Sequence, residues 1–437
     1  MIRKFLFCGL IFLIAGCTSP SAFDRDYVSE GLQERSDFQL GETAEPGEFQ
    51  CPDGVSLDDG LTLDEAVTLA LWNNAQFQAD LATLGFVRAD LIEANMLPNP
   101  TLSLLFPFGD RQLESTLKIP LDALWQRPRR IAAAEYDAES LAENLVVNGL
   151  GVIRDVQIAY AELWLTREQA RLAEQDANLR VESAKLSQVR LRAGDISELE
   201  NTVAQVDTLR ARDTALQLTN QAEIMRLRLK ALLGITSNEV SFELTPLTIA
   251  QKTDVPIDEL LQTAFAARPD LRAVELSIEA AGERIGWEKS KIFRFIAVID
   301  GDESSDGSFD IGPGLEVEIP ILNQNEGRIA RAKAELEQSA RRYEALRQNI
   351  ILQVHEAYSR YQAVHNEYHI WQTNIIPSLE TAIRQAQKSF AVGEVSYLMV
   401  LATQRELVAA HMRQAELAAQ LSQTTAQLNY SVGKKIL

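Results

Sequence analysis

The sequence has few of the residues that crosslink a chain or interrupt a helix. Only 3 of its 437 residues are cysteine, 14 are proline and 22 are glycine. Cys8 and Cys17 fall in or at the end of an export signal, so Cys51 alone is left for a crosslink and no intrachain disulfide can form. In an oxidising compartment, stability must then come from packing and association. Sparse proline and glycine favour long helices.

Basic residues are also in short supply. The chain has 42 Lys and Arg against 62 Asp and Glu, a formal net charge of −20. Neutralising phosphates requires clustered Lys and Arg, so this balance excludes nucleic acid as a partner. A phosphate-binding loop is absent too, because Gly433-Lys434 has Leu428 in place of the upstream glycine and Lys435 in place of Ser or Thr. Without a paired nucleophile and base, we expect no enzyme, and energy for any transport must come from a partner.

Residues 1–16 are typical of an export signal. Arg3 and Lys4 give a basic start, and residues 5–15 form an apolar segment too short to span a membrane as a mature helix. Residues 13–17 resemble the bacterial lipobox, in which the cysteine becomes the lipidated first residue. Thr18 follows instead of aspartate, so this resemblance implies sorting to the outer membrane. We expect a covalent lipid on Cys17 and no other cofactor; losing Arg3 and Lys4 makes the formal charge −22, two below −20.

Residues 328–391 carry the strongest periodic signal. Apolar residues recur there every three or four positions, as in a coiled coil, and the turn at 392–396 follows. At 1.5 Å per residue, such a helix reaches roughly 90 to 100 Å. The pattern therefore predicts a helix that must pack sideways against other long helices.

The same pattern occurs earlier in the chain. Residues 156–160 match 354–358, and the turn around Gly194 matches the turn around Gly393 with glycine and serine in register. The chain therefore reads as a duplication, with a first repeat at 61–240, a linker at 241–255 and a second repeat at 256–437. Residues 17–60 lack sustained periodicity, and we expect them to form an extended, lipidated tether.

Each repeat is predicted to run helix, β-hairpin, long helix, tight turn and return helix. In the first, a capping box of Thr62 and Glu65 opens a helix that continues to Leu97, and Pro128 is expected at the first position of the long helix. The hairpin strands are expected at 101–106 and 113–119, and at 293–299 and 309–321 around an acidic loop at 300–307. Four strands are too few to close a barrel, and exposed edges are a liability, so several chains must come together.

Several motifs together carry a family resemblance. Residues 61–66, 97–102, 268–271 and the two glycine turns resemble the lipoprotein branch of the outer membrane efflux protein (TolC-like) family, over nearly all of the chain after residue 60. The resemblance implies a mainly α fold with a small β part, in which duplicated long-helix coiled-coil repeats and four strands form a trimeric α-helical tunnel and a shared 12-stranded outer-membrane β-barrel.

The family resemblance also implies function and partners. It implies an outer-membrane exit duct of a tripartite efflux pump, which passively conducts small toxic compounds outward. The implied partners are two further copies of the chain, a periplasmic adaptor, an inner-membrane transporter that is proton-driven, and outer-membrane lipid. We expect a lipid-anchored protein of the bacterial outer membrane with a large periplasmic extension.

The resemblance places adaptor contacts at the two turns. The residues carried over, or added as their charged neighbours, are Arg192, Gly194, Asp195, Ser197, Gly393, Glu394 and Ser396. Glycine permits the left-handed backbone of a reversal, and the serine is expected to cap the returning helix.

A gate is harder to assign, because this chain departs from the family's pattern. The best-known members constrict the tunnel with aspartates shortly after the second glycine, where this chain has Met399 and Ala402. The first repeat offers Glu198 and Glu200 instead. The candidate gate residues are Glu198, Glu200, Leu398, Met399 and Ala402, and one hypothesis is a constriction lined by Leu398, Met399 or Leu401.

Several alternatives stay open on sequence alone. The exit duct of a type I protein secretion system has the same architecture, and a periplasmic coiled-coil lipoprotein would tether other envelope proteins without forming a channel. The spacing of His365 and His369 could hold zinc, but no third ligand is apparent. Trp125 fits either an interfacial aromatic belt or helix packing. The sequence does not identify the cargo, which could be a drug, a metal, an organic compound or a polypeptide.

Overall fold

The computed structural model describes residues 22–436, except 44, 58–59, 107, 109–112, 237–241, 250–254 and 304–307. The signal sequence and the lipidation site expected at Cys17 lie outside the described residues. The chain divides into two compact units, each of which combines segments from both predicted repeats. The first contains residues 80–146 and 269–348, with the described residues before 29; the second contains 29–79, 147–268 and the rest of the chain from 349. The repeat and linker boundaries stay a prediction.

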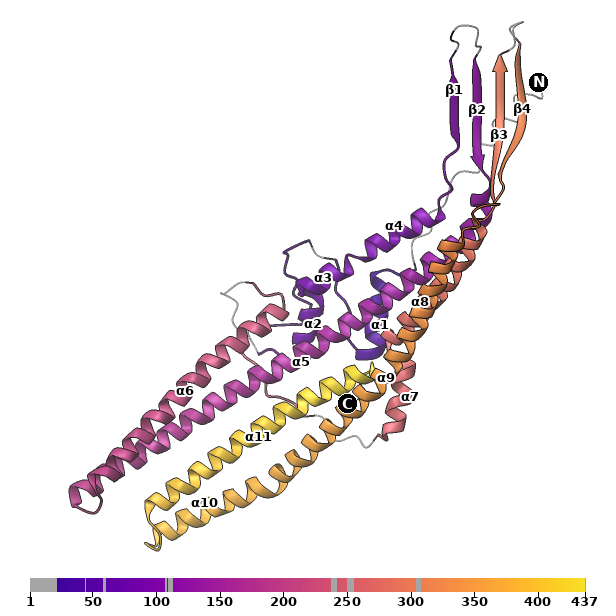
Figure 1. Ribbon diagram of the computed structural model, residues 1–437. Helices are drawn as coiled ribbons and strands as arrows, with labels where there is room; N and C mark the ends of the chain where they lie inside the picture. Colours follow the sequence, from indigo (N-terminus) through magenta and orange to yellow (C-terminus); the bar gives the residue numbers. More distant parts are fainter. Residues whose placement is uncertain are drawn as a thin grey trace. The chain divides into compact units, whose positions relative to one another are not determined.

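The first unit contains the only sheet of the described residues (Figure 1). Its strands β1 (Thr101–Leu105), β2 (Glu114–Pro120), β3 (Arg294–Glu303) and β4 (Phe309–Glu318) lie in sequence order. The two predicted hairpins are confirmed, and antiparallel pairing of β2 with β3 joins them. The boundary of the acidic loop was wrong, because residues 300–303 extend β3 and pair with both neighbouring strands.

The helices of this unit are α4 (Leu84–Asn95), α8 (Pro269–Ser290) and the first parts of α5 (Asp122–Ala193) and α9 (Glu326–Ile370). Pro128 does not start α5 as expected, but lies inside it. The helix begins directly after β2, where Asp122 occupies the first turn and its carboxylate accepts a hydrogen bond from Gln126 at 3.1 Å. A carboxylate is favourable near a helix N-terminus, and a proline further along removes only one helical hydrogen bond.

The single helix expected from Leu61 to Leu97 is divided into three. It consists of α2 (Leu63–Asn73), α3 (Ala75–Leu81) and α4. The predicted capping box of Thr62 and Glu65 is confirmed. The first break occurs because Asn74 has an extended backbone, and its side-chain oxygen accepts a hydrogen bond from the Phe77 N–H at 3.0 Å. Asparagine favours such side-chain to backbone bonds at the ends of helices.

The second unit contains two long helical hairpins. One is formed by α5 and α6 (Glu198–Leu232), and the other by α10 (Ile376–Ala391) and α11 (Tyr397–Val432). The long helix expected at 328–391 is confirmed, but it contains a π-helical segment, η3 (Trp371–Ile375), in which the Ile376 N–H bonds to the Trp371 carbonyl. Pro377, two residues after the end of η3, has no backbone N–H to donate to the helix, which accounts for an irregular turn here. The apolar periodicity of the sequence gives no sign of this turn.

Shorter elements close the end of this unit opposite the turns of the hairpins. The expectation of an extended tether was wrong for α1 (Arg25–Ser36), whose Leu32 is fully buried. A side chain at Gly149 of α5 would lie within 2.8 Å of Leu32, so this glycine permits the close approach of α1. Arg35 donates a 2.8 Å hydrogen bond to the carbonyl of Ala267, which ends α7 (Ile257–Ala267). Leu61 forms a parallel bridge with Leu244, and both its carbonyl and that of Thr245 accept hydrogen bonds from Tyr160.

Arg268 holds the C-terminal end of α11 in place. Its buried guanidinium donates to the Gln353 side chain at 2.7 Å and to the Ser431 carbonyl at 3.0 Å. Replacing Arg268 with alanine takes the guanidinium donor away from the buried Ser431 carbonyl and from the half-buried Gln353 side chain, so we expect a loss of about 3 kcal/mol in the free energy of unfolding. Lysine should not rescue it, because one ammonium lacks the geometry of the guanidinium fork.

The measurement is the midpoint of thermal unfolding followed by circular dichroism. Arg272→Ala is the control, since Arg272 is half exposed and pairs with Glu139 at the surface, where such pairs contribute little. If the two alanine variants unfold at the same temperature, Arg268 does not anchor the helix.

Candidate functional site: hairpin turns, link, seam and sheet

The turns of the two long hairpins have the same backbone geometry. Gly194 and Gly393 have φ values of 79° and 80°. In both turns the glycine N–H bonds to the carbonyl three residues back, and the next N–H bonds to the carbonyl five residues back. This pair of hydrogen bonds ends a helix whose next residue adopts the left-handed conformation, which glycine does without steric cost. The prediction that both glycines adopt the left-handed backbone of a reversal is confirmed.

The caps of the returning helices differ. Ser197 and Glu200 form a capping box, in which the Ser197 N–H donates to the Glu200 carboxylate at 2.7 Å and the Glu200 N–H donates to the Ser197 hydroxyl at 3.2 Å. The Ser197 N–H and hydroxyl both donate to the Glu200 carboxylate and lower the pKa of Glu200. Ser396 makes no side-chain cap, so that expectation was wrong: the Met399 N–H donates to the Ser396 main-chain carbonyl instead. Methionine at this position cannot return the second bond of a capping box.

The candidate adaptor and gate residues lie at or near these turns. Arg192, Asp195, Glu198 and Glu394 are exposed, as are Met399 and Ala402, whereas Leu398 is half-buried. Leu401 is 1% exposed and packs inside the unit, so the hypothesis that it lines a constriction was wrong. The roles of the other candidates in gating or in adaptor contact stay predictions.

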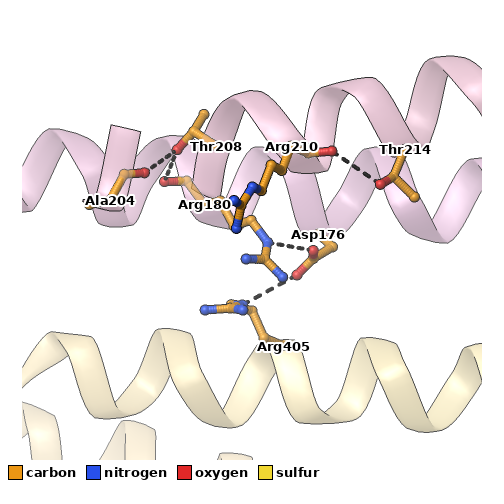
Figure 2. A network of polar contacts seen from close by, with 7 residues as sticks. All are labelled: Asp176, Arg180, Ala204, Thr208, Arg210, Thr214 and Arg405. Atoms are coloured by element: carbon orange, nitrogen blue, oxygen red, sulfur yellow. Dashed lines mark hydrogen bonds and ion pairs between the residues drawn. The ribbon is translucent and has the colours of Figure 1, made fainter. Parts of the chain in front are cut away.

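A polar link joins the two hairpins further along, and sequence reasoning missed it. In Figure 2 the Asp176 carboxylate of α5 lies between two arginines. It accepts a 2.7 Å hydrogen bond from Arg180 of the same helix and forms a 3.4 Å ion pair with Arg405 of α11. The Thr208 hydroxyl of α6 donates to the Arg180 carbonyl at 3.1 Å. The Asp176 carboxylate therefore joins α5 to α11, and α6 is attached to the same place through the main chain of Arg180.

Two further contacts connect the same hairpins. The Tyr397 hydroxyl donates to Glu182 at 3.2 Å, and the Gln169 amide donates to Glu416 at 3.2 Å. Desolvation and the neighbouring Glu182 raise the pKa of Tyr397. We refer to the Asp176–Arg405, Tyr397–Glu182 and Gln169–Glu416 contacts as the hairpin link. Parting the hairpins requires these three contacts to break.

Helix α6 has apolar residues on two opposite faces. One face packs within the unit and includes the buried residues Ala211, Ala222, Met225 and Leu229. A second stripe runs along the other side, with its members 39% to 73% exposed: Leu199, Val203, Val206, Leu209, Leu216, Ile224 and Leu227. We call this stripe the α6 seam. Its members recur at intervals of three, four, seven and eight residues, which keeps them on one side of the helix as in a coiled-coil interface.

The sheet of the first unit has an apolar and a polar face, and no described residues cover either of them. The register places these residues on the apolar face: Leu102, Leu104, Leu117, Ile119, Phe295, Ala297, Ile299, Ile311, Leu315 and Val317. The other face carries most of the charges, with Lys118 paired to Glu316 at 2.6 Å and Arg294 to Glu318 at 3.5 Å. An uncovered apolar face of this kind is typical of contact with lipid.

Three carboxylates lie side by side on the polar face. Glu114 is directly opposite Asp302 on the neighbouring strand, and Asp302 is directly opposite Asp310 on the next. Like charges directly opposite each other destabilise a sheet, so this row lowers the stability of the fold and is not explained by a structural role. Among the described residues, no group of three or more His, Cys, Asp and Glu is arranged to hold a metal ion, and no helix is long and apolar enough to cross a membrane.

Comparisons with known proteins agree with this architecture. The sequence profile of the outer membrane efflux protein family matches residues 108–235 and 260–434. The chain is 25% identical over 374 residues to the cobalt-zinc-cadmium resistance protein CzcC of Cupriavidus metallidurans, covering 84% of this chain and 88% of CzcC. It is 26% identical over 277 residues to the probable outer membrane lipoprotein SilC of Salmonella typhimurium, covering 59% of this chain and 58% of SilC.

Solved structures share the fold. A structure of CusC superposes with a TM-score of 0.69 at 18% identity, covering 91% of this chain and 99% of CusC. The outer-membrane channel OprN gives a TM-score of 0.68 at 20% identity, covering 85% of this chain and 90% of OprN. With the family profile matching both hairpin segments, the chain belongs to the outer membrane efflux protein family.

Proposed function

We propose that the chain is the outer-membrane exit duct of a tripartite efflux pump, open to passive diffusion and supplied by a periplasmic adaptor and an inner-membrane transporter. The observation that carries this proposal is the sheet with one apolar and one charged face. If the apolar face meets lipid, the charged face lines a water-filled passage. We propose that the long hairpins form the periplasmic part of the duct.

Closure of such a passage requires more than one copy. Strands β1 and β4 each have one edge without a pairing strand among the described residues, and an open edge in lipid costs several kcal/mol for each unpaired backbone group. The α6 seam is the corresponding unpartnered surface of the helical part. We propose that three copies close both surfaces at once, four strands from each forming a ring of twelve.

We propose that the hairpin turns are the docking point of the adaptor. Exposed Arg192, Asp195 and Glu394 flank the two glycines and are available for polar contacts. The hairpin link holds the two hairpins of one chain together near these turns. Docking would open the duct by favouring a state in which the link is broken, which is a population shift between two states.

We propose inorganic cations as the first class of cargo to test. CzcC is named for resistance to cobalt, zinc and cadmium. Other relatives are the cation efflux protein CusC and the solvent and toluene efflux proteins of Pseudomonas putida. A row of carboxylates on the charged face of the sheet would suit a passage for cations.

The experiment is deletion of the gene in the native host. The deletion strain should become more sensitive to at least one class among divalent metals, silver or copper, and organic solvents, and the intact gene should restore resistance. Culture supernatants are analysed in parallel. Loss of a secreted polypeptide with unchanged resistance would contradict efflux and support a type I secretion duct; no change in either would contradict both.

The acidic row on the sheet should determine the charge selectivity of the passage. Replacing Glu114 with Gln and Asp302 with Asn removes two carboxylates per chain without changing side-chain size. The reversal potential measured across a bilayer in a KCl gradient should move toward zero, because fewer fixed charges attract cations. Asp258→Asn with Glu259→Gln, both exposed on α7, is the matched control. An equal shift in the control, or no shift in either, would show that the row does not line the passage.

A further inference from the structure

The base of the sheet carries a band of exposed apolar and aromatic side chains. Trp125 and Phe293 are 43% and 53% exposed, and both rings contact Phe295, with centroids 5.4 Å and 6.4 Å apart. The chain leaving β4 adds Ile319 and Leu322, which are 73% and 98% exposed. These residues continue the apolar face of the sheet toward the helices. Exposed aromatic residues at such a border are typical of the boundary between hydrocarbon and lipid headgroups.

Positive charge is concentrated next to this band. Three charged segments meet the base of the sheet, beside the uncharged residues 96–100 that lead into β1 (Figure 1). They are residues 121–133 at the start of α5, residues 283–295 from the end of α8 into β3, and residues 319–333 from the end of β4 into α9. Together they contain ten Lys and Arg but only four Asp and Glu. The whole chain has the opposite balance, with 42 basic and 62 acidic residues. The junction is therefore a basic region in an acidic protein.

Contacts within the unit hold these three segments together. The Arg129 guanidinium of α5 lies against Gly286 of α8 and is 3.4 Å from Glu283. The Asn325 amide, just before α9, donates to both the carbonyl and the carboxylate of Glu288 at 2.8 Å. These bonds fix the cationic segments relative to one another and to the base of β3.

The acids of the junction are already engaged, while several cations face solvent. Glu288 accepts from Lys291 at 2.5 Å, and the Lys291 ammonium also lies 3.5 Å from the centre of the Trp287 ring. Arg129 is half exposed, and Lys289 and Arg328 are exposed. These exposed cations can donate hydrogen bonds to an incoming anion. Phosphate is a suitable anion, because its oxygens accept charge-assisted hydrogen bonds.

We propose that this junction binds the headgroups of anionic glycerophospholipids in the periplasmic leaflet of the outer membrane. The inference rests on the proposed function, which puts the sheet in that membrane. The phosphate would lie against Arg129, Lys289 and Arg328, while the acyl chains would cover Trp125, Phe293 and the residues after β4. A charged surface beside an apolar one matches the two parts of a lipid, whereas a free phosphate would use only one of them.

The experiment compares lipid retention by the purified, lipidated assembly. The assembly is placed in nanodiscs of phosphatidylethanolamine with one fifth phosphatidylglycerol, and the lipids that stay bound are counted by native mass spectrometry. The variant is the triple substitution of Arg129, Lys289 and Arg328 by Gln. The control carries Lys185→Gln, Arg210→Gln and Arg212→Gln, which remove the same charge from the exposed surface of α5 and α6.

The wild type and the control should retain phosphatidylglycerol at least tenfold in preference to phosphatidylethanolamine, and the triple variant should lose most of this preference, since each basic residue near an anionic surface adds to binding. Soluble glycerol phosphate should not compete. No preference in the wild type, an equal loss in the control, or full competition by glycerol phosphate would overturn the inference. Conductance measured in the same lipids separates the outcomes: a conducting assembly without lipid preference overturns only this inference, and no conductance in any lipid overturns the proposed function.

Discussion

Replacing Asp176 with alanine should raise the conductance of the resting duct, because the hairpins of each chain would lose the carboxylate that Arg180 and Arg405 share. Charge-assisted hydrogen bonds contribute roughly 1.5 to 3 kcal/mol when buried, and somewhat less at the 19% exposure of this side chain. A change of about 1.4 kcal/mol alters a two-state equilibrium tenfold. With one link in each copy, we expect at least a tenfold increase in the open fraction, measured as mean current in a planar bilayer.

Glu174→Ala is the matched control for this prediction. Glu174 is exposed two residues away on the same helix, so the variant removes the same charge and leaves the hairpin link intact. A double variant with Asp176→Arg and Arg405→Asp should return the current toward the wild-type value if the pair acts through its attraction. Equal currents in the wild type and in Asp176→Ala would mean that the link does not hold the duct closed.

Placing charges in the α6 seam should prevent the copies from associating. Leu209 and Leu216 lie seven residues apart near its middle, both more than 60% exposed in the single chain. Burying a leucine contributes about 1.5 to 3 kcal/mol, and an unpaired carboxylate in the same place adds a large desolvation cost. The variant Leu209→Glu with Leu216→Glu should therefore be a monomer in mild detergent, measured by light scattering, while the wild type has the mass of three chains.

Arg212→Glu with Thr219→Glu controls for added charge. Both positions are exposed and have the same seven-residue spacing on the same helix, and at 3.6 residues per turn they fall outside the arc that the members of the stripe cover. We expect this variant to associate like the wild type. If both variants stay trimeric, or both dissociate, the seam is not the specific contact between copies.

Features governed by local sequence could be predicted, whereas most packing could not. The long helices follow from apolar spacing, and the turns at Gly194 and Gly393 from the backbone that glycine permits. The hairpin strands likewise follow from alternation and turn residues, although the end of β3 depends on pairing with its neighbours. Helix α1 was missed because its burial depends on Gly149, which is far away in the sequence.

The candidate site divides in the same way. The residues at the turns were found from the repeat and the family resemblance. The hairpin link was not, because Asp176 and Arg405 belong to different repeats and meet only through the packing of α5 against α11. The difference between the two caps was also missed, since both turns have a serine and only the residue at the third position, Glu200 or Met399, decides whether a capping box forms.

The most direct test of the exit-duct proposal is the conductance of the purified, lipidated protein in a planar lipid bilayer, measured together with its mass in detergent. We expect a mass of three chains and a small, mostly closed conductance that increases when the hairpin link is removed. A monomer without conductance would contradict it, and would leave a coiled-coil lipoprotein that tethers other components of the envelope.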